Sequence, residues 1–326
     1  MVQELVSPTW GFIGLGRMGY AMARRLRDNM PKSSTLLISD VNSQVLDRFI
    51  CETRQPATST VTDAEMPSVQ IAGNVRELAE RSTVIITCLA SPEIVKSVFE
   101  AIISNGRLPT LHQGRMFIDA STIDPTTSRG IAKAVRSELD ADFVDAPVSG
   151  GVVAARAGKL SIMFGASLKS EKLIERVRSV LLLMGTKICH VGPQGAGVAG
   201  KLANNYILAV NNIATAEAMN MGQHWGIDLT VLTELINSST GRCWPTAVNN
   251  PVPGVIKDSP ASRDYEPGGT VGVIQKDLRL AMAGAQEAGV ELALAKTADD
   301  VYTAVEAAYS GKDLSIVYKW MQEGHQ

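Results

Sequence analysis

A glycine-rich turn near the start of the sequence has the spacing that dinucleotide binding needs. Gly14, Gly16 and Gly19 form a G-x-G-x-x-G pattern between an apolar, β-rich segment and a helical one. In such a turn the first glycine permits the tight bend, the second lets the backbone approach a pyrophosphate, and the third lets helix and strand pack closely. The amino terminus of the helix then presents N–H groups and its positive dipole end to the phosphates. A glycine-rich structural turn without a ligand is the alternative interpretation.

An acidic residue at the end of the next expected strand supports dinucleotide binding and indicates which cofactor is used. Asp40 follows Gly16 by 24 residues, close to the spacing of about 20 expected for the carboxylate that binds the ribose. A carboxylate accepts hydrogen bonds from the ribose hydroxyls and repels a 2′-phosphate. No Lys or Arg follows Asp40 before Arg48. The sequence therefore predicts NAD, rather than NADP, as the cofactor.

A lysine early in a long helical stretch is a candidate general acid/base beside the expected dinucleotide site. Reactions at a nicotinamide cofactor need groups that move protons and bind the substrate. Lys201 follows a glycine-rich segment that we expect to admit the cofactor or substrate close to the backbone, and Asn205 lies one turn later on the same helical face. Burial would favour the neutral amine that a base requires, whereas an anionic substrate would oppose it. A solvated surface amine is the alternative for this lysine.

A serine followed by two glycines is the candidate site for a substrate carboxylate. Ser149, Gly150 and Gly151 come after the expected strand Phe143–Ala146. A hydroxyl and exposed backbone N–H groups can bind a small anion, and ligands of open α/β sheets bind at the carboxyl ends of the strands. A plain turn between strands is the alternative interpretation.

These residues depend on elements that alternate between strand and helix in the first half of the chain. The expected strands are Thr9–Ile13, Thr35–Ser39, Thr83–Leu89, Met116–Asp119 and Phe143–Ala146, and the expected helices are Met18–Arg27, Val75–Arg81, Glu93–Ile103 and one that begins at Asp124-Pro125. Asp is a favoured N-cap and Pro a favoured first helical residue. Strands that alternate with helices of this size predict a parallel, doubly wound sheet with helices on both faces, a Rossmann-like domain. The polar segment Thr53–Gln70 is expected to be a loop.

The second half of the sequence has the pattern of an all-α domain. The expected helices are a long stretch over Gly195–Gly222, then Leu229–Asn237, Val273–Ala288 and Leu292–Tyr309, with a loop over Lys257–Gly269. We therefore predict a Rossmann-like domain over residues 1–191 and an all-α domain over residues 192–326, joined by the long helix. Because that helix has no strong polar face, we expect most of it to be buried, some of it by a second copy of the chain. This predicts a homo-oligomer, either a dimer or a tetramer.

Composition and charge exclude several classes of function. The 326 residues carry 31 Lys+Arg against 33 Asp+Glu, a net charge of −2, which does not support general binding of nucleic acid. No apolar run approaches the roughly 20 residues that a membrane helix requires. The four cysteines form no C-x-x-C pair and the four histidines no H-x-H or H-x-x-x-H pair, so we expect reduced thiols and no metal site. The segment before Pro8 resembles neither a secretory signal nor a transit peptide.

Four separated segments, in order along nearly the whole chain, resemble those of the β-hydroxyacid dehydrogenase family. They are GFIGLGRMG at Gly11–Gly19, FVDAPVSGGVVAARAGKL at Phe143–Leu160, GPQGAGVAGKLANN at Gly192–Asn205 and KDLRLA at Lys276–Ala281. The resemblance implies an NAD-dependent dehydrogenase that acts on a small hydroxy acid and uses a lysine as general acid/base.

The resemblance also assigns roles to individual residues. It implies catalysis by Lys201 and Asn205 and substrate binding by Ser149, Gly150 and Gly151. It implies cofactor binding by Gly14, Leu15, Gly16, Met18, Gly19, Asp40, Leu89, Ala90, Thr122 and Lys276. Without the resemblance, Thr122 is nearly as well explained as a threonine at a helix start, and Lys276 as a surface lysine.

Three residues depart from the pattern of the family. Arg25 stands where the family usually has Asn, Ala90 where it usually has Pro, and Ile94 where relatives have an Asn that contacts the cofactor. These differences concern how the cofactor is held rather than the chemistry.

Two shorter segments narrow the expected substrate. STGRCW at Ser239–Trp244 and NPVPGV at Asn250–Val255 are similar to segments of family members that act on 3-hydroxyisobutyrate. The resemblance thus implies oxidation of 3-hydroxyisobutyrate to methylmalonate semialdehyde, a step of valine catabolism. Arg242 either contacts the substrate or caps the preceding helix, and the sequence leaves both open.

The sequence leaves alternative functions and an alternative cellular location open. The same chemistry fits another short hydroxy acid, as in reductases of the tartronate or succinic semialdehyde type. A non-catalytic, dehydrogenase-like binding module is an alternative of another class, and Lys201 and Asn205 argue against it. The resemblance implies a mitochondrial enzyme in eukaryotes, with a cytoplasmic enzyme as the alternative.

Overall fold

The computed structural model describes residues 8–54, 66–111, 114–167, 170–266 and 268–324, which form two compact units. The first unit ends at Lys201 and the second begins at Leu202, so both share helix α8 (Ala196–His224). Because that helix belongs to both units, the division of the chain into residues 1–191 and 192–326 stays a proposal.

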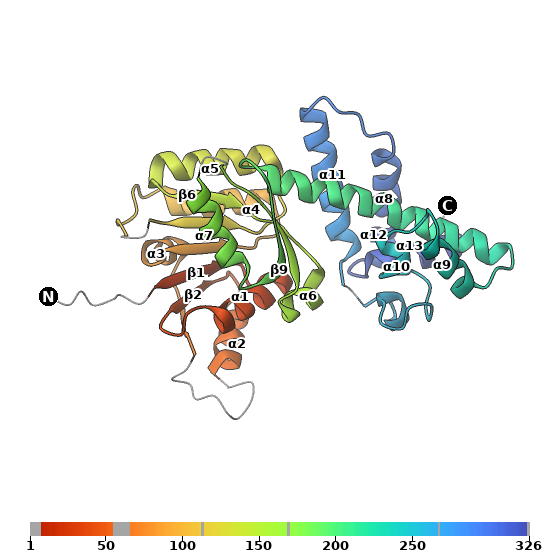
Figure 1. The fold of residues 1–326 in the computed structure, drawn as a ribbon, viewed down its shortest axis with the longest axis horizontal. Helices are drawn as coiled ribbons and strands as arrows, with labels where there is room; N and C mark the ends of the chain where they lie inside the picture. Colours follow the sequence, from red (N-terminus) through yellow and green to blue (C-terminus); the bar gives the residue numbers. More distant parts are fainter. Residues whose placement is uncertain (1–7, 55–65, 112–113, 168–169, 267, 325–326) are drawn as a thin grey trace. The chain divides into compact units, whose positions relative to one another are not determined.

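The described part of the first unit is built on one nine-stranded sheet (Figure 1). Its strands are β1 (Thr9–Ile13), β2 (Thr35–Ser39), β3 (Ser68–Ile71), β4 (Val84–Thr87), β5 (Met116–Asp119), β6 (Asp142–Asp145), β7 (Val148–Ser149), β8 (Leu160–Gly165) and β9 (Gly185–Gly192). Their order is β3-β2-β1-β4-β5-β6-β8-β7, with β9 paired to β8. All pairs from β3 to β6 are parallel, whereas β8 runs antiparallel to β6 and β7. The carboxyl ends of the parallel strands therefore lie along one edge of the sheet.

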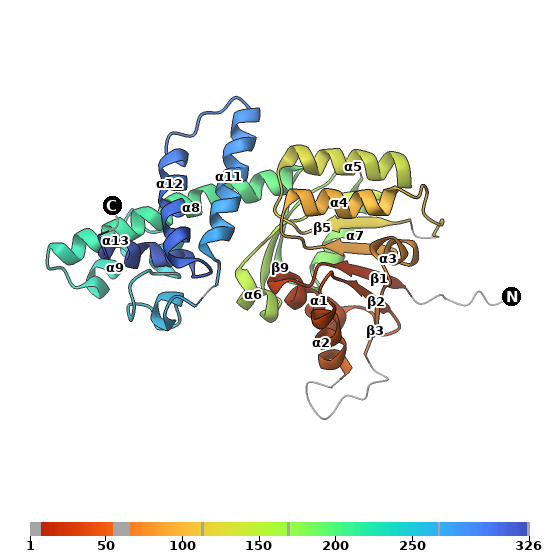
Figure 2. The ribbon, with the colours of Figure 1, turned by 180° about the vertical axis from the view of Figure 1, so that it is seen from behind.

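Helices cover both faces of this sheet (Figures 1 and 2). They are α1 (Arg17–Asn29), α2 (Ser43–Arg54), α3 (Val75–Arg81), α4 (Pro92–Ile103), α5 (Pro125–Leu139), α6 (Gly151–Ala157) and α7 (Glu171–Leu181). Neighbouring residues of a strand point to opposite faces, and in β2 Leu36 and Ile38 join one core while Leu37 joins the other. A strand that is apolar on both faces needs helices on both, which confirms the predicted doubly wound sheet.

The expected start of α5 is confirmed at the level of individual hydrogen bonds. The helix begins at Pro125, and the carboxylate of Asp124 accepts a hydrogen bond from the amide of Thr127 at 2.7 Å. This side chain satisfies one of the amides that the first turn of a helix leaves without a partner.

The expected loop over Thr53–Gln70 is wrong at both ends. Helix α2 continues to Arg54, and β3 begins at Ser68 and pairs in parallel with β2. Residues 55–65 of the expected loop lie outside the described residues. Strand β3 is a four-residue edge strand in which three residues are exposed. Its sequence, SVQI, alternates polar and apolar residues over only four positions, which is too short to distinguish it from the polar segment before it.

In the described residues the second unit consists of helices and the turns between them, as predicted. Beyond α8 it contains α9 (Leu229–Ser238), α10 (Trp244–Ala247), η2 (Pro260–Arg263), α11 (Val271–Glu287), α12 (Ala295–Tyr309), η3 (Leu314–Ile316) and α13 (Val317–Gln322). The expected loop Lys257–Gly269 thus contains one short 3-10 helix, η2. The core of the unit includes the fully buried Tyr302, whose hydroxyl donates to the carbonyl of Ala209 in α8 at 2.9 Å. One face of α8 is therefore buried within the unit, whereas Ile207 and Ala214 are exposed, so in the single chain the expected burial of most of the helix holds on one side only.

Candidate active site

The glycine turn between β1 and α1 has the geometry that its spacing predicts. Gly14 has a φ of +94°, and a Cβ there would collide with the carbonyl oxygen of Cys88. A Cβ on Gly19 would collide with the carbonyl oxygen of Gly14, whereas a Cβ on Gly16 would meet no atom within 4 Å. The three positions thus serve a tight bend, an open approach and a close helix packing, in that order. No side chain caps α1, and its first turn holds no acidic residue, so the turn fits a bound pyrophosphate.

Asp40 lies directly against this turn. One carboxylate oxygen accepts a hydrogen bond from the amide of Leu15 at 2.6 Å, and the other accepts from the amide of Asn42 at 2.8 Å. The amide of Gly14 donates to the carbonyl of Ser39 at 2.9 Å, which fixes the end of β2 beside the turn. Two segments that are far apart in sequence are thereby held in the arrangement that a dinucleotide site requires.

The predicted cofactor residues after β4 and β5 are linked by a buried carboxylate that the sequence analysis missed. Asp119, at the end of β5, accepts hydrogen bonds from the hydroxyl of Thr87 at 2.7 Å and from the amide of Ser121 at 3.1 Å. The hydroxyl of Ser121 in turn accepts from the amide of Leu89 at 2.9 Å. The loops that carry Leu89, Ala90 and Thr122 are therefore fastened to each other at the carboxyl edge of the sheet.

Asp119 is completely buried, and its surroundings shift its ionisation. Burial raises its pKa from 3.8 to about 6, the hydrogen bonds from Ser121 and Thr87 oppose that rise, and the negative charge of Asp145 adds to it. Asp145 is its register partner on β6. Two buried acidic residues thus stand side by side where these strands end, and the polar ends of apolar strands are the signal that could have found them.

Asp145 organises the start of α8. Its two carboxylate oxygens accept hydrogen bonds from the amides of Gly195 at 2.7 Å and Val198 at 2.8 Å. Burial raises the pKa of this carboxyl, and these backbone amides act against the rise. The side chain therefore caps a helix that begins far from it in the sequence.

Two of the glycines before Lys201, Gly195 and Gly197, pack against the protein where a Cβ would point, so on that side they do not admit the cofactor or substrate, contrary to the expectation. A Cβ on Gly197 would lie 2.7 Å from the carbonyl oxygen of Met163 and 2.8 Å from that of Asp145. A Cβ on Gly195 would lie 3.2 Å from the side chain of Arg129. The space beside these glycines is already filled by β6, β8 and α5, because α8 starts very close to the sheet.

The Ser149–Gly151 segment forms a tight turn after β6. Ser149 ends the two-residue strand β7, and Gly150 and Gly151 have φ angles of +130° and +67°. A left-handed backbone of this kind favours glycine and turns successive amides in one direction. Helix α6 follows directly, with no side chain capping its first turn. The segment thus has the donors that a small carboxylate needs.

Lys201 and Asn205, the two predicted catalytic residues, are both buried in α8. Lys201 is 8% exposed and Asn205 is 5% exposed. They lie one helical turn apart and therefore on the same face. The burial of Lys201 contradicts the alternative of a solvated surface amine.

In the second unit, Asn205 and Lys276 meet through a residue that the sequence analysis did not single out. The side-chain amide of Asn205 donates to Asp277 at 2.6 Å, and the ammonium of Lys276 lies 3.2 Å from the other carboxylate oxygen. Asn204 donates to the carbonyl oxygen of the Asn205 side chain at 3.0 Å. Asp277 stands in the KDLRLA segment, so its place beside Lys276 in the sequence was the available signal.

Two residues that depart from the family pattern have visible surroundings. The guanidinium of Arg25 in α1 packs over Gly158, where a Cβ would lie 2.7 Å from a guanidinium nitrogen. Arg25 thus packs α1 against the end of α6. Ile94 lies on an exposed face of α4. Arg242, for which the sequence left two roles open, is exposed.

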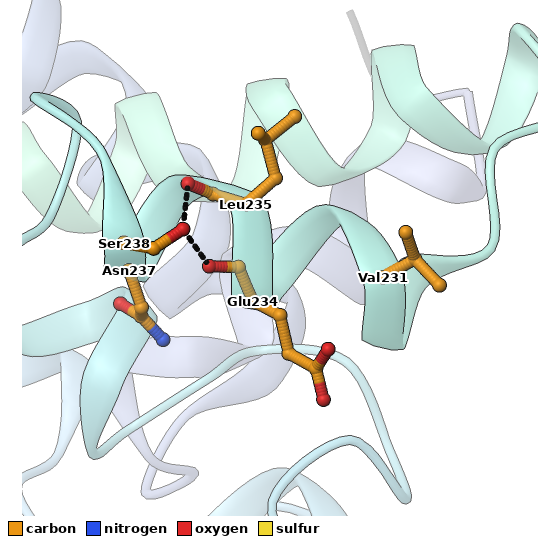
Figure 3. Close-up of a pocket in the computed structure, with 5 residues that line it drawn as sticks. All are labelled: Val231, Glu234, Leu235, Asn237 and Ser238. Atoms are coloured by element: carbon orange, nitrogen blue, oxygen red, sulfur yellow. Dashed lines mark hydrogen bonds between the residues drawn. The ribbon is translucent and has the colours of Figure 1, made fainter.

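A hollow on the surface of α9 contains none of the predicted site residues (Figure 3). It is lined by Val231, Glu234, Leu235, Asn237 and Ser238. The hydroxyl of Ser238 is occupied with the carbonyl groups of Glu234 and Leu235 at 2.8 and 3.1 Å. Because none of the predicted site residues lines it, the hollow is not the candidate active site.

Among the residues that the structure describes, no group of three or more His, Cys, Asp or Glu residues could hold a metal ion. No helix in the described residues is long and apolar enough to cross a membrane. The four cysteines are free thiols.

Comparison with known families covers almost the whole chain. Residues 9–192 match the family model of the NAD binding domain of 6-phosphogluconate dehydrogenase. Residues 195–321 match the family model described as the NAD-binding domain of NADP-dependent 3-hydroxyisobutyrate dehydrogenase.

Individual relatives agree with these matches. The chain is 37% identical to mouse mitochondrial 3-hydroxyisobutyrate dehydrogenase over 96% of its own length and 87% of the relative's. It is 36% identical to a probable mitochondrial 3-hydroxyisobutyrate dehydrogenase of Dictyostelium discoideum, over 97% and 92% of the two chains. Among solved structures, it resembles Mycobacterium tuberculosis 3-hydroxyisobutyrate dehydrogenase with L-serine, with a TM-score of 0.83, 31% identity and coverage of 97% and 99%.

Proposed function

The chain belongs to the 3-hydroxyisobutyrate dehydrogenase family, and from this premise we propose that it oxidises 3-hydroxyisobutyrate to methylmalonate semialdehyde, a step of valine catabolism. The chain is an oxidoreductase with a Rossmann-like NAD(P)-binding domain. The observation that carries the proposal is the burial of Lys201, one helical turn before Asn205 in a helix that Asp145 anchors at the carboxyl edge of the sheet.

The residues around the glycine turn would hold the cofactor. The turn from Gly14 to Gly19, with Leu15 and Met18, would face the pyrophosphate, and Asp40 would accept hydrogen bonds from the adenosine ribose. Leu89, Ala90 and Thr122 would also contact the cofactor, and the motif match adds Lys276 of the second unit as a further proposed cofactor-binding residue. Bound NAD supplies an acceptor for the hydride. Although one matching family model is described by NADP-dependent enzymes, the carboxylate of Asp40 would repel a 2′-phosphate, so we propose NAD for this chain.

The remaining chemistry falls to side chains and amides of this protein. The Oγ of Ser149 and the amides of Gly150 and Gly151 would donate hydrogen bonds to the substrate carboxylate. The neutral Nζ of Lys201 would take the proton of the hydroxyl group as hydride leaves the carbon that bears this group. The alcohol thereby becomes an aldehyde and the amine of Lys201 becomes an ammonium. The side-chain amide of Asn205 would form hydrogen bonds with the reacting oxygen and with Lys201. Its hydrogen bond to Asp277 holds this side chain in place.

A substrate panel tests the proposal. NADH formation is followed with 3-hydroxyisobutyrate, serine, glycerate, 3-hydroxypropionate and 4-hydroxybutyrate, each with NAD⁺ and with NADP⁺. The expected result is the highest kcat/KM with 3-hydroxyisobutyrate and NAD⁺. A preference for another acid would reject the substrate and keep the chemistry. Protein that binds NADH but turns over none of the acids would contradict the proposed catalysis.

We also propose a homo-oligomer located in mitochondria. Ile207 and Met221 of α8, Trp225, and Val231 and Leu235 of α9 are each at least half exposed in the single chain, which is the kind of apolar surface that a second copy covers. The mitochondrial location follows from relatives that carry this location in their names. A monomeric mass by light scattering at micromolar concentration would contradict the first proposal, and a purely cytosolic fraction of the native protein would contradict the second.

A further inference from the structure

We propose that Asp145 is a positioning residue that sets the place of Lys201 by anchoring the first turn of α8 to the end of β6. The inference rests on the proposed function, because it assumes that Lys201 is the base. Asp145 itself would touch neither substrate nor cofactor. Its effect would pass through two hydrogen bonds to the backbone of α8.

The two hydrogen bonds fix the helix at the residue before its first turn and at a residue within that turn. One oxygen of Asp145 binds the amide of Gly195, just before α8, and the other binds the amide of Val198, in its first turn. Lys201 follows Val198 by three residues, about 4.5 Å along the helix axis. A helix is stiff over one turn, so a displacement of its first turn would move Lys201 by a similar distance.

The carboxylate of Asp145 is closely packed on the sides that face β8 and α8. A Cβ on Gly165 of β8 would lie 2.6 Å from the carboxylate, and a Cβ on Gly197 of α8 would lie 2.8 Å from it. Both glycines are therefore needed for β6, β8 and α8 to approach the same side chain. A carboxylate also complements the positive dipole end of the helix, which a neutral side chain would do less well.

The same strand leads into the proposed carboxylate site. Ser149 follows Asp145 by four residues and ends β7, a two-residue strand that pairs with β8, as β6 does. The anchor of the lysine helix and the turn that would bind the substrate are thus joined by a short segment of chain and packed on the same strand, β8. Hydride transfer is sensitive to such placement, because an error of about 1 Å in the position of reacting groups can cost about 100-fold in rate.

The principal test is Asp145→Asn in the full-length protein. The amide keeps the shape of the side chain but turns an NH₂ group toward one of the two helix amides, which removes one hydrogen bond and the charge. We expect kcat to fall by about 100-fold, with the Kd for NADH within about twofold of wild type. We also expect faster hydrogen exchange at the amides of Gly195 and Val198, and a larger primary deuterium isotope effect on kcat, because hydride transfer becomes the slow step.

Gly197→Ala tests the anchor from the helix side, and covers the case in which Asp145→Asn does not fold. Its methyl group would press on Asp145 and Met163 without removing the carboxylate, so we expect the same fall in kcat and the same rise in the isotope effect. Val144→Ala is the matched control. Val144 is fully buried and adjacent on β6, and its truncation should lower stability without changing kcat per folded molecule or the isotope effect.

The outcome separates this inference from the proposed function. Wild type and Lys201→Ala are measured beside the other variants. Wild type that does not oxidise 3-hydroxyisobutyrate, or Lys201→Ala that keeps its activity, would overturn the proposed function. An inactive Lys201→Ala together with an Asp145→Asn or Gly197→Ala variant of wild-type kcat would overturn the positioning role alone. A loss of activity in these variants that follows only their loss of folded protein, as in Val144→Ala, would overturn it as well.

Discussion

Asn205 donates a 2.6 Å hydrogen bond to Asp277, a residue 72 positions further along the chain. Asp277 also pairs with Lys276, so one carboxylate contacts two residues that the sequence motifs single out. Both Asn205 and Asp277 are nearly inaccessible to solvent. A buried pair of this kind holds each side chain in one orientation, since losing either partner leaves a polar group without a hydrogen bond.

This pair should behave as one unit in stability measurements. Asn205→Ala or Asp277→Ala alone leaves a buried polar partner unsatisfied, whereas the double variant removes both groups. We expect a coupling of about 1–3 kcal/mol in the free energy of unfolding, measured by denaturant titration of the two single variants and the double variant. Strictly additive effects would show that the hydrogen bond contributes nothing.

Removal of the proposed base should stop turnover and spare cofactor binding. Lys201→Ala loses the amine that would accept the hydroxyl proton, so kcat should fall by at least about 100-fold. The Kd for NADH, measured by fluorescence titration, should stay close to wild type. Lys187→Ala, at an exposed lysine of β9, is the control and should be fully active. A Lys201→Ala variant with wild-type kcat would disprove the assignment.

The charge of Asp40 should decide between the two nicotinamide cofactors. Asp40→Asn removes the repulsion of a 2′-phosphate and weakens the hydrogen bonds to the ribose and to the amide of Leu15. We expect the ratio of kcat/KM for NAD⁺ to that for NADP⁺ to fall by about 10-fold or more. Asp47→Asn changes the charge equally at an exposed position of α2 and should leave the ratio unchanged. An unchanged ratio in Asp40→Asn would remove the basis for predicting NAD.

The buried carboxyl of Asp119 should make stability depend on pH. Its pKa is 3.8 when the chain is unfolded and about 6 in the folded protein, so between these values the folded state binds more protons. Raising the pH through this window therefore costs stability, by up to about 3 kcal/mol for a shift of about 2 pH units. Asp119→Asn does not titrate, so the stability of wild type relative to this variant should decrease as the pH rises. The free energy of unfolding of both proteins is measured by denaturant titration at each end of this pH window. A difference between wild type and Asp119→Asn that does not change with pH would refute the prediction.

Asp313 should be one of the most sensitive positions for the stability of the second unit. Its carboxylate accepts hydrogen bonds from the amides of Gly268, Gly269 and Ser315 and from the side chains of Asn249 and Ser315. Asp313→Ala leaves these donors without their partner, and we expect a loss of about 3 kcal/mol or more in the free energy of unfolding. The exposed Asp258→Ala should change it by less than about 0.5 kcal/mol. Equal effects of the two substitutions would contradict the central role of Asp313.

Much of the fold follows from patterns that are local in the chain. The bounds of β1, β2, β5 and α3 agree with those expected from the sequence, because an apolar run between turn residues, or a helical period between caps, is complete within a few residues. The glycine turn belongs to the same class, since its three glycines and Asp40 are defined by spacing. The exposed edge strand β3 was missed because its alternation extends over only four residues and follows a polar segment, so its pairing with β2 is what reveals it.

What the sequence alone could not determine is which polar groups meet across long separations. The contact of Asp145 with Val198 spans 53 residues and that of Asn205 with Asp277 spans 72, and no local pattern encodes either. The glycines before Lys201 show the same limit, because their spacing is equally compatible with the approach of a ligand and with close packing. Only the folded chain decides between them, since the space next to a glycine is filled or open according to residues that are brought there by the rest of the fold.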